Sequence, residues 1–149
     1  MSILGRIYNG VFHALGQPHG DDDSPGTVLT AKRTLGNKGE DHALRLLRRR
    51  GHKLVTRNWS CRSGELDLIT WHGETLVFTE VRTRSSTEFG TPAESVNFRK
   101  QERMRRAAHW YLAKHYPDGR LPSCRYDVVW VLVRENEIAD SGVMEGAFC

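Results

Sequence analysis

The sequence has little of what several large classes of protein require. Its 149 residues include three cysteines, which are odd in number and far apart at Cys61, Cys124 and Cys149. They match neither a disulfide framework nor a CxxC metal site, so a reducing, cytoplasmic location is predicted. The seven histidines show no HExxH spacing, and no serine or cysteine stands in a nucleophile motif. No apolar run reaches the ~20 residues that a membrane span needs.

What the sequence does have is an uneven excess of positive charge. Lys and Arg number 22 against 18 Asp and Glu, which gives a net charge of +4. Residues 1–31 hold one base and three acids, whereas residues 32–149 hold 21 bases and 15 acids, a net charge of +6. A basic body favours a polyanionic partner such as nucleic acid, although many basic proteins bind no polyanion.

The chain divides into an arm and one domain. Residues 1–31 are predicted to be a flexible arm that includes a linker, residues 16–26, rich in Gly, Pro and Asp. Residues 32–149 are predicted to form a single α/β domain in the order α-β-β-β-α-β. Its elements are expected at about 31–50 or 36–50, 53–59, 65–71, 75–84, 92–115 and 125–133, with a short last strand at 137–139. This order indicates a mixed sheet flanked by helices.

The first predicted helix carries an acid on its apolar side. Ala43, Leu44 and Leu47 share one face at helical spacing, and Glu40 lies in the middle of that stripe. A carboxylate that faces a sheet loses hydration and needs a partner, which makes Glu40 a candidate functional residue. The competing interpretation is that Glu40 helps to cap the helix or extends outward to solvent.

The predicted hairpin gathers more acids. Glu65 and Asp67 share one face of the first strand, and Glu80, Arg82 and Arg84 share one face of the second. A turn centred on residues 72–73 would place Glu65 opposite Glu80 and Asp67 diagonal to it, about 7–8 Å away. Such carboxylates suit Mg²⁺, which takes one or two of them together with water and phosphate oxygens. Alternatively, the arginines neutralise the acids as an ordinary ion-pair patch.

The long predicted helix has a basic residue on its apolar face. Lys100 lies near the middle of that face, whereas Arg99, Arg103 and Arg106 line up elsewhere as a stripe that faces solvent or phosphates. Lys100 can reach a site beneath the helix, or it can run its methylene stem over the core and expose its amine. The four tryptophans lie on predicted elements and are expected in the core rather than as platforms for bases, at Trp59, Trp71, Trp110 and Trp130.

Together these segments resemble the YraN-like family of uncharacterised bacterial proteins, which is related to archaeal Holliday-junction resolvases and the restriction-endonuclease-like fold. The resemblance covers roughly Leu35 to Phe148. It rests on the strings GNKGEDHAL, RNW, GELDLI, FTEVRTR, FGTPAESV with the following Lys100, and CRYDVV. No single string is specific, but their order and spacing together are.

The resemblance implies a PD-(D/E)xK site, and thus a nuclease that depends on Mg²⁺ or Mn²⁺ and acts on DNA, including branched DNA, more readily than on RNA. Glu40 is then the helical acid, Asp67 and Glu80 are the strand acids and metal ligands, and Glu65 lies just outside them. Arg82 stands where the pattern has lysine, and Lys100 is the candidate to replace it. Arg84 and the helical arginines would hold the phosphate backbone. Resolvases of this type act as dimers, so a homodimer is a further expectation.

Two other functions fit the same residues. A protein that kept the fold and lost the chemistry would bind structured DNA, with Arg82 marking the lost lysine, because arginine stays protonated and cannot exchange a proton. A scaffold module would instead recruit a protein partner through residues 1–31.

Overall fold

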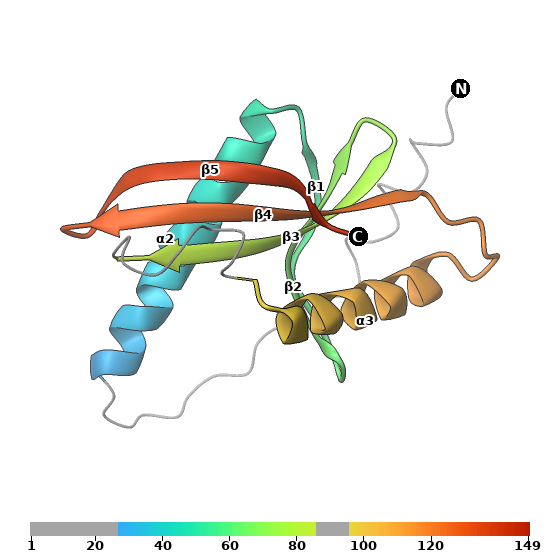
Figure 1. The fold of residues 1–149 in the computed structure, drawn as a ribbon, viewed down its shortest axis with the longest axis horizontal. Coiled ribbons are helices and arrows are strands. Elements are labelled where there is room, and N and C mark those ends of the chain that lie inside the picture. The colour runs from blue at the N-terminus through green and yellow to red at the C-terminus, as the bar shows by residue number, and fades with distance from the viewer. Residues whose placement is uncertain (1–26, 86–95) are drawn as a thin grey trace.

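The computed structural model describes residues 27–85 and 96–149. They form a five-stranded sheet in the order β1-β2-β3-β4-β5 and two helices, as Figure 1 shows. The elements are α2 (Thr27–Arg49), β1 (Lys53–Cys61), β2 (Gly64–His72), β3 (Thr75–Arg84), α3 (Phe98–His115), β4 (Ser123–Arg134) and β5 (Glu137–Phe148). This confirms the predicted mixed sheet flanked by helices.

The sheet is mixed because one connection crosses it. β1, β2 and β3 form an antiparallel meander, β4 pairs with β3 in parallel after the α3 crossover, and β5 returns antiparallel to β4. The β1–β2 hairpin turns away from the other three strands, and the two helices lie on opposite sides of the sheet (Figure 1). No helix in the described ranges is long and apolar enough to cross a membrane.

Each helix covers its own core. Under α2, Leu44 and Leu47 pack with Leu68, Val129 and Val131 of the sheet. On the other face, α3 buries its inward residues against β2, β3 and β4, at Met104, Ala107, Ala108, Tyr111, Leu66, Ile69, Phe78 and Val128. The two apolar stripes that the sequence predicted are therefore the two faces that are buried.

Local signals set the end of α2 and the start of α3. Gly51, at φ +88°, accepts the left-handed backbone after α2, and its N–H bonds to the carbonyl of Arg48. The helix predicted from Pro92 begins instead at Phe98, because the Asn97 side chain caps it by accepting the N–H of Lys100 at 3.0 Å. Residues 92–95 lie outside the described ranges, and so does the predicted arm up to residue 26. Residues 27–31, predicted as part of the arm, belong instead to α2, which begins at Thr27.

Two other expectations need correction. The last strand runs to Phe148 rather than Ala139, and two glycines make this possible: Gly142 lets the Trp130 ring lie directly against the strand, and Gly146 adopts φ +59°. Trp110, expected in the core, is 50% exposed. It lies one residue before the buried Tyr111, on a flank of α3 beside the turn between β1 and β2.

Candidate functional site

The carboxylates gather where β2 and β3 stop pairing. Their ladder runs from His72 opposite Thr75 to Leu68 opposite Thr79, and continuing it by one residue places Asp67 opposite Glu80. The predicted register, with Glu65 opposite Glu80, is wrong by two residues. Its cause is the turn, which consists of Gly73, at φ +59°, and Glu74, rather than being centred one residue earlier. An even shift keeps every side chain on its predicted face, so the acids still converge.

Glu80 is a buried acid with an incomplete set of partners. Only 2% of its surface is exposed, on the sheet face that α3 covers. Lys100 places its Nζ 3.1 Å from Oε1, and Nη1 of Arg82 lies 3.6 Å from the same oxygen. The second oxygen, Oε2, is buried without a hydrogen-bond partner in the described structure. Such an oxygen costs free energy unless a proton or a cation approaches it.

Asp67 completes a pair with Glu80. Burial raises the pKa of the Asp67 carboxyl to about 7, and the neighbouring charge of Glu80 adds to this rise. Two groups act in the opposite direction: the N–H of Val81, which donates to Oδ2 at 2.7 Å, and the Lys100 ammonium. Near neutral pH, Asp67 therefore sits between its protonated and charged forms.

Glu40 reaches this region from α2. The helix lies close to β3 at Gly39, where any Cβ would overlap the Thr83 side chain. Burial raises the pKa of Glu40, and the negative charges of Asp67 and Glu65 raise it further. Glu40 therefore lies within electrostatic reach of the strand acids, which supports the inward orientation predicted from its helix position.

Two residues that sequence reasoning passed over support Glu40. The Asn58 side chain hydrogen-bonds to it and lowers its pKa. Arg57 places Nη2 3.7 Å from Glu40 Oε2 and 2.7 Å from Asp41 Oδ1. Asn58 holds φ +49°, a conformation that asparagine tolerates better than most residues. The sequence signal for these two residues was the string RNW, which is part of the family resemblance but was assigned no role.

The remaining predicted residues lie around the pair rather than in it. Glu65 is exposed near the start of β2, and Arg84 is half-buried at the end of β3. Arg99, Arg103 and Arg106 are exposed on α3. Lys100 is about one third exposed along its side chain and turns toward Glu80, so the helix presents it to the site as its position predicted.

The donor set fits a cation held by few protein ligands. Within the described ranges, no group of three or more His, Cys, Asp or Glu side chains is placed to hold a metal ion. Two carboxylates are nevertheless enough for Mg²⁺, which keeps several of its waters. Asp67 and Glu80 meet that requirement, and the unpartnered Oε2 of Glu80 gives such an ion an acceptor.

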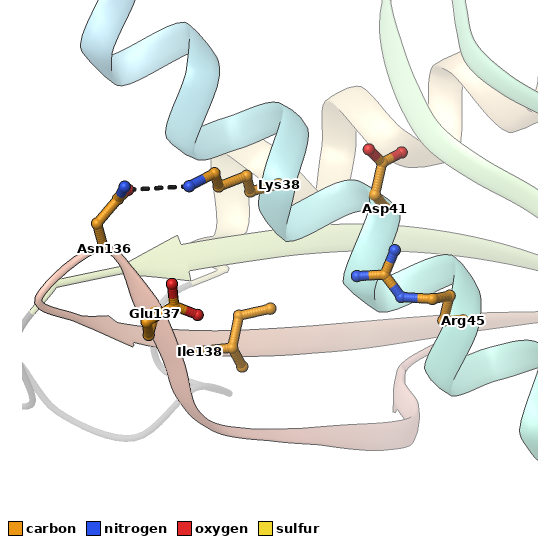
Figure 2. Close-up of a pocket in the computed structure, with 6 residues that line it drawn as sticks. All are labelled: Lys38, Asp41, Arg45, Asn136, Glu137 and Ile138. Atoms are coloured by element: carbon orange, nitrogen blue, oxygen red, sulfur yellow. Dashed lines mark hydrogen bonds between the residues drawn. The ribbon is translucent and has the colours of Figure 1, made fainter.

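Two other polar regions lie on the α2 side of the molecule. A groove of about 280 Å³ between α2 and the start of β5 is lined by Lys38, Asp41, Arg45, Asn136, Glu137 and Ile138 (Figure 2). Its charges are of mixed sign, and Lys38 already donates to Asn136 at 3.2 Å.

The second region is a closed network around Asp127, which is fully buried. Asp127 accepts two 2.8 Å bonds from Arg125 and a 2.9 Å bond from the N–H of Gly146. His72 lies 3.3 Å from the same guanidinium and stacks on His52. These bonds hold β2, β4 and β5 together, so the network has a structural role.

Comparison with known proteins places this arrangement in a family. The model described as "Uncharacterised protein family UPF0102" matches residues 39–131, which include the carboxylate pair, Glu40 and Lys100. A UPF0102 protein of Moorella thermoacetica is 48% identical over 122 residues, 81% of this chain and 100% of that protein. One from Nocardia farcinica is 50% identical over 102 residues, 68% of this chain and 79% of that protein. One from Caldicellulosiruptor saccharolyticus is 38% identical over 120 residues, 78% of this chain and 98% of that protein. The chain belongs to the UPF0102 family, as the resemblance of its motifs to the YraN-like proteins predicted.

Proposed function

We propose that this protein is a metal-dependent nuclease that hydrolyses phosphodiester bonds of DNA at the Asp67–Glu80 pair. One observation carries the proposal: a half-buried acid, Asp67, lies beside the buried acid Glu80, and one buried oxygen, Oε2 of Glu80, lacks a hydrogen-bond partner in the described structure. A fold that needed only stability gains nothing from such a pair, because each charge raises the free energy of the other.

A divalent cation would resolve this conflict. Asp67 and Glu80 would hold Mg²⁺ or Mn²⁺, with Glu40 as a further ligand or a partner through water. A bound ion supplies an acidified water and polarises the phosphate. The raised pKa of Asp67 means that the ion competes with a proton for this site, so its binding weakens as the pH falls below about 7.

The chain's own residues would position the substrate. Lys100, held 3.1 Å from Glu80, would place an ammonium beside the scissile phosphate, and Arg82 would add a fixed positive charge. Arginine can orient and stabilise charge but does not exchange protons, so Lys100 is the better candidate for assisting the attacking water. Arg84 would contact the backbone further along, and Glu65 would orient water at the exposed edge.

The expected substrate is DNA, including branched DNA, in the cytoplasm. Contacts to phosphates give affinity that depends on salt and little on sequence. Symmetric cleavage of a four-way junction needs two sites, so we propose a homodimer for that substrate. Sedimentation of the protein with and without a junction tests the dimer separately from cleavage.

The test uses labelled four-way-junction, duplex and single-stranded DNA with Mg²⁺, Mn²⁺ or EDTA. The double variant Asp67→Asn/Glu80→Gln should lower metal-dependent cleavage by at least about 100-fold. Glu74→Gln, an exposed acid in the turn of the same hairpin, is the matched control and should cleave normally. Mn²⁺ should also raise the melting temperature of the unmodified protein and leave that of the double variant unchanged. Normal cleavage by the double variant would exclude this site.

One observation favours a second candidate, a DNA-binding protein without catalysis. Arg82 occupies the lysine position of the PD-(D/E)xK pattern and pairs with Glu80, so the positive charge remains while proton exchange is lost. Such a protein would bind junctions equally well in EDTA and in Mg²⁺ and would leave them intact. Cleavage in either metal decides against it.

A further inference from the structure

One flank of α3 carries three exposed arginines and a half-exposed aromatic ring. Arg99, Arg103, Arg106 and Trp110 follow one another at spacings of four, three and four residues. On a helix with 3.6 residues per turn they fall within about 60° of one another. All four are exposed, and together they form what we call the α3 stripe.

On the other flank of α3, Arg105 forms contacts within the fold. Arg105 lies 2.7 Å from both Glu102 and the carbonyl of Cys149, and its guanidinium lies over the Phe148 ring. Its charge is taken up within the fold. Within the described ranges, none of the three stripe arginines forms an ion pair, so their charges face solvent.

Trp110 is held in place while its ring stays accessible. Its Nε1 donates to Ser63 at 3.1 Å, in the turn between β1 and β2, and half of its surface is exposed. The helix approaches this turn closely, because a Cβ on Gly64 would lie 3.0 Å from the carbonyl oxygen of Arg103. The polar edge of the indole is therefore anchored, and the ring is a fixed apolar surface beside a row of guanidiniums.

We propose that the α3 stripe binds an unpaired stretch of DNA, with phosphates on the arginines and one base stacked on Trp110. The assignment rests on the proposed nuclease function and names its substrate class. Guanidiniums contact phosphates of any nucleic acid, but an indole ring stacks only on a base whose face is free. Stacked duplex hides those faces, so the combination selects a single strand, a flap or an open junction.

The stripe also leads to the carboxylate pair. Lys100 follows Arg99 directly and points to Glu80 from the inner edge of the same helix. A strand that lies along α3 would therefore pass Lys100 on its way to Asp67 and Glu80. The structure thus places binding surface and candidate chemistry on one rigid element.

The first experiment measures binding in EDTA, so that cleavage plays no part. Fluorescence anisotropy compares a single strand of about 15 nucleotides with a duplex and with RNA of the same sequence. Trp110→Ala should weaken single-strand binding by about tenfold or more, Trp110→Phe should keep most of it, and duplex binding should be unchanged. Leu121→Ala removes an equally exposed apolar side chain outside the stripe and is the control.

The second experiment measures the dependence on salt. Arg103→Gln should reduce the slope of log affinity against log salt by about one, whereas Arg48→Gln, an exposed arginine at the end of α2, should leave it unchanged. This variant keeps the test valid if Trp110→Ala fails to fold.

Three results would overturn the proposal: unchanged single-strand binding by Trp110→Ala, an equal loss on duplex, or tighter binding of RNA. Cleavage assays and binding assays in EDTA, with Asp67→Asn/Glu80→Gln and Trp110→Ala compared in each, separate this proposal from the proposed nuclease function. If no cleavage is found but binding in EDTA depends on Trp110, the stripe stands and the nuclease fails. Metal-dependent cleavage of single strands that Trp110→Ala leaves unchanged would support the nuclease and exclude the role of the α3 stripe.

Discussion

In the carboxylate pair, a favourable ion pair and an unfavourable contact between two acids lie side by side. Glu80 is balanced by Lys100 and Arg82 on one oxygen, while its other oxygen is buried without a hydrogen-bond partner in the described structure and the charge of Glu80 raises the pKa of Asp67. Moving either acid by one position along its strand would turn it to the opposite face of the sheet. The chemistry proposed here therefore depends on the alternation of side chains along two short strands.

Asp67 should make the protein less stable in alkali when metal is absent. Its pKa is raised in the folded state, so its contribution is fully present below the unfolded value near 4 and is lost as the pH rises through about 7. In EDTA near pH 8, Asp67→Asn should therefore raise the free energy of unfolding by roughly 1–3 kcal/mol. Urea unfolding measures the change. Glu74→Gln should show none, and a destabilised Asp67→Asn at that pH would contradict the assignment.

Lys100 should matter through its ammonium rather than its stem. Lys100→Ala should lower metal-dependent cleavage by about 100-fold, because it removes a positive charge directed at the reacting phosphate. Lys114→Ala, an exposed lysine at the far end of α3, serves as the control. Lys100→Arg restores the charge without proton exchange, so its pH–rate profile separates the two roles. Full cleavage by Lys100→Ala would remove Lys100 from the site.

Much of the site was predictable from residues, and its errors were local. The period of the helix placed Glu40 and Lys100, and the period of two in strands placed Asp67 and Glu80. The register was missed because turn residues alone did not distinguish a turn at residues 73–74 from one centred a residue earlier. Asn58 was missed because its contact with Glu40 joins a strand and a helix that the sequence does not relate.

At the scale of elements, the position of α2 depends on Gly39. The helix lies so close to β3 that a methyl group at Gly39 would overlap Thr83. Gly39→Ala should therefore destabilise the protein by roughly 1–3 kcal/mol, since a packed region must shift to admit it. Gly36→Ala lies in the same helix with open space around it and should stabilise by about 0.5–1 kcal/mol. Thermal unfolding compares the two.

A second substitution tests the cause of this effect. Thr83→Ala removes the hydroxyl that an alanine at position 39 would meet, so Gly39→Ala/Thr83→Ala should recover part of the lost stability. If both glycine variants behave alike, the close approach of α2 and β3 does not determine the stability. Because Glu40 follows Gly39, the same displacement should also move this acid away from Asp67.

The order of the elements was predictable because each segment shows the spacing of apolar residues that is typical of a helix or a strand. The bounds of the elements were less predictable. β3 was predicted to the residue, since a turn precedes it and its sequence is rich in β-branched and aromatic residues. β5 was underestimated because its glycines resemble turn signals, whereas in the sheet they admit Trp130 and turn a backbone N–H to Asp127. The cap of α3 was missed because Pro92 is a stronger start signal in sequence than Asn97.

For the whole molecule, Asp67 and three histidines act in opposite directions on the stability as the pH changes. Burial lowers the pKa of His52 between α2 and the sheet, and it lowers those of His42 and His115 as well. A histidine of this kind stays neutral when folded and takes up a proton when unfolded. Its contribution is therefore present above the unfolded pKa near 6.5 and is lost as the pH falls through the lower, folded value.

Between about pH 4 and 7, a rise in pH should lower the unfolding free energy through Asp67 and raise it through the histidines, so the two effects offset each other. Unfolding free energy in EDTA should then change little with pH for the unmodified protein. Asp67→Asn removes one side of the balance, so its stability should rise with pH through this range. His52→Gln weakens the other side, so its stability should fall more steeply with pH than that of the unmodified protein. Parallel profiles for the two variants would show that these groups do not control the pH dependence of folding.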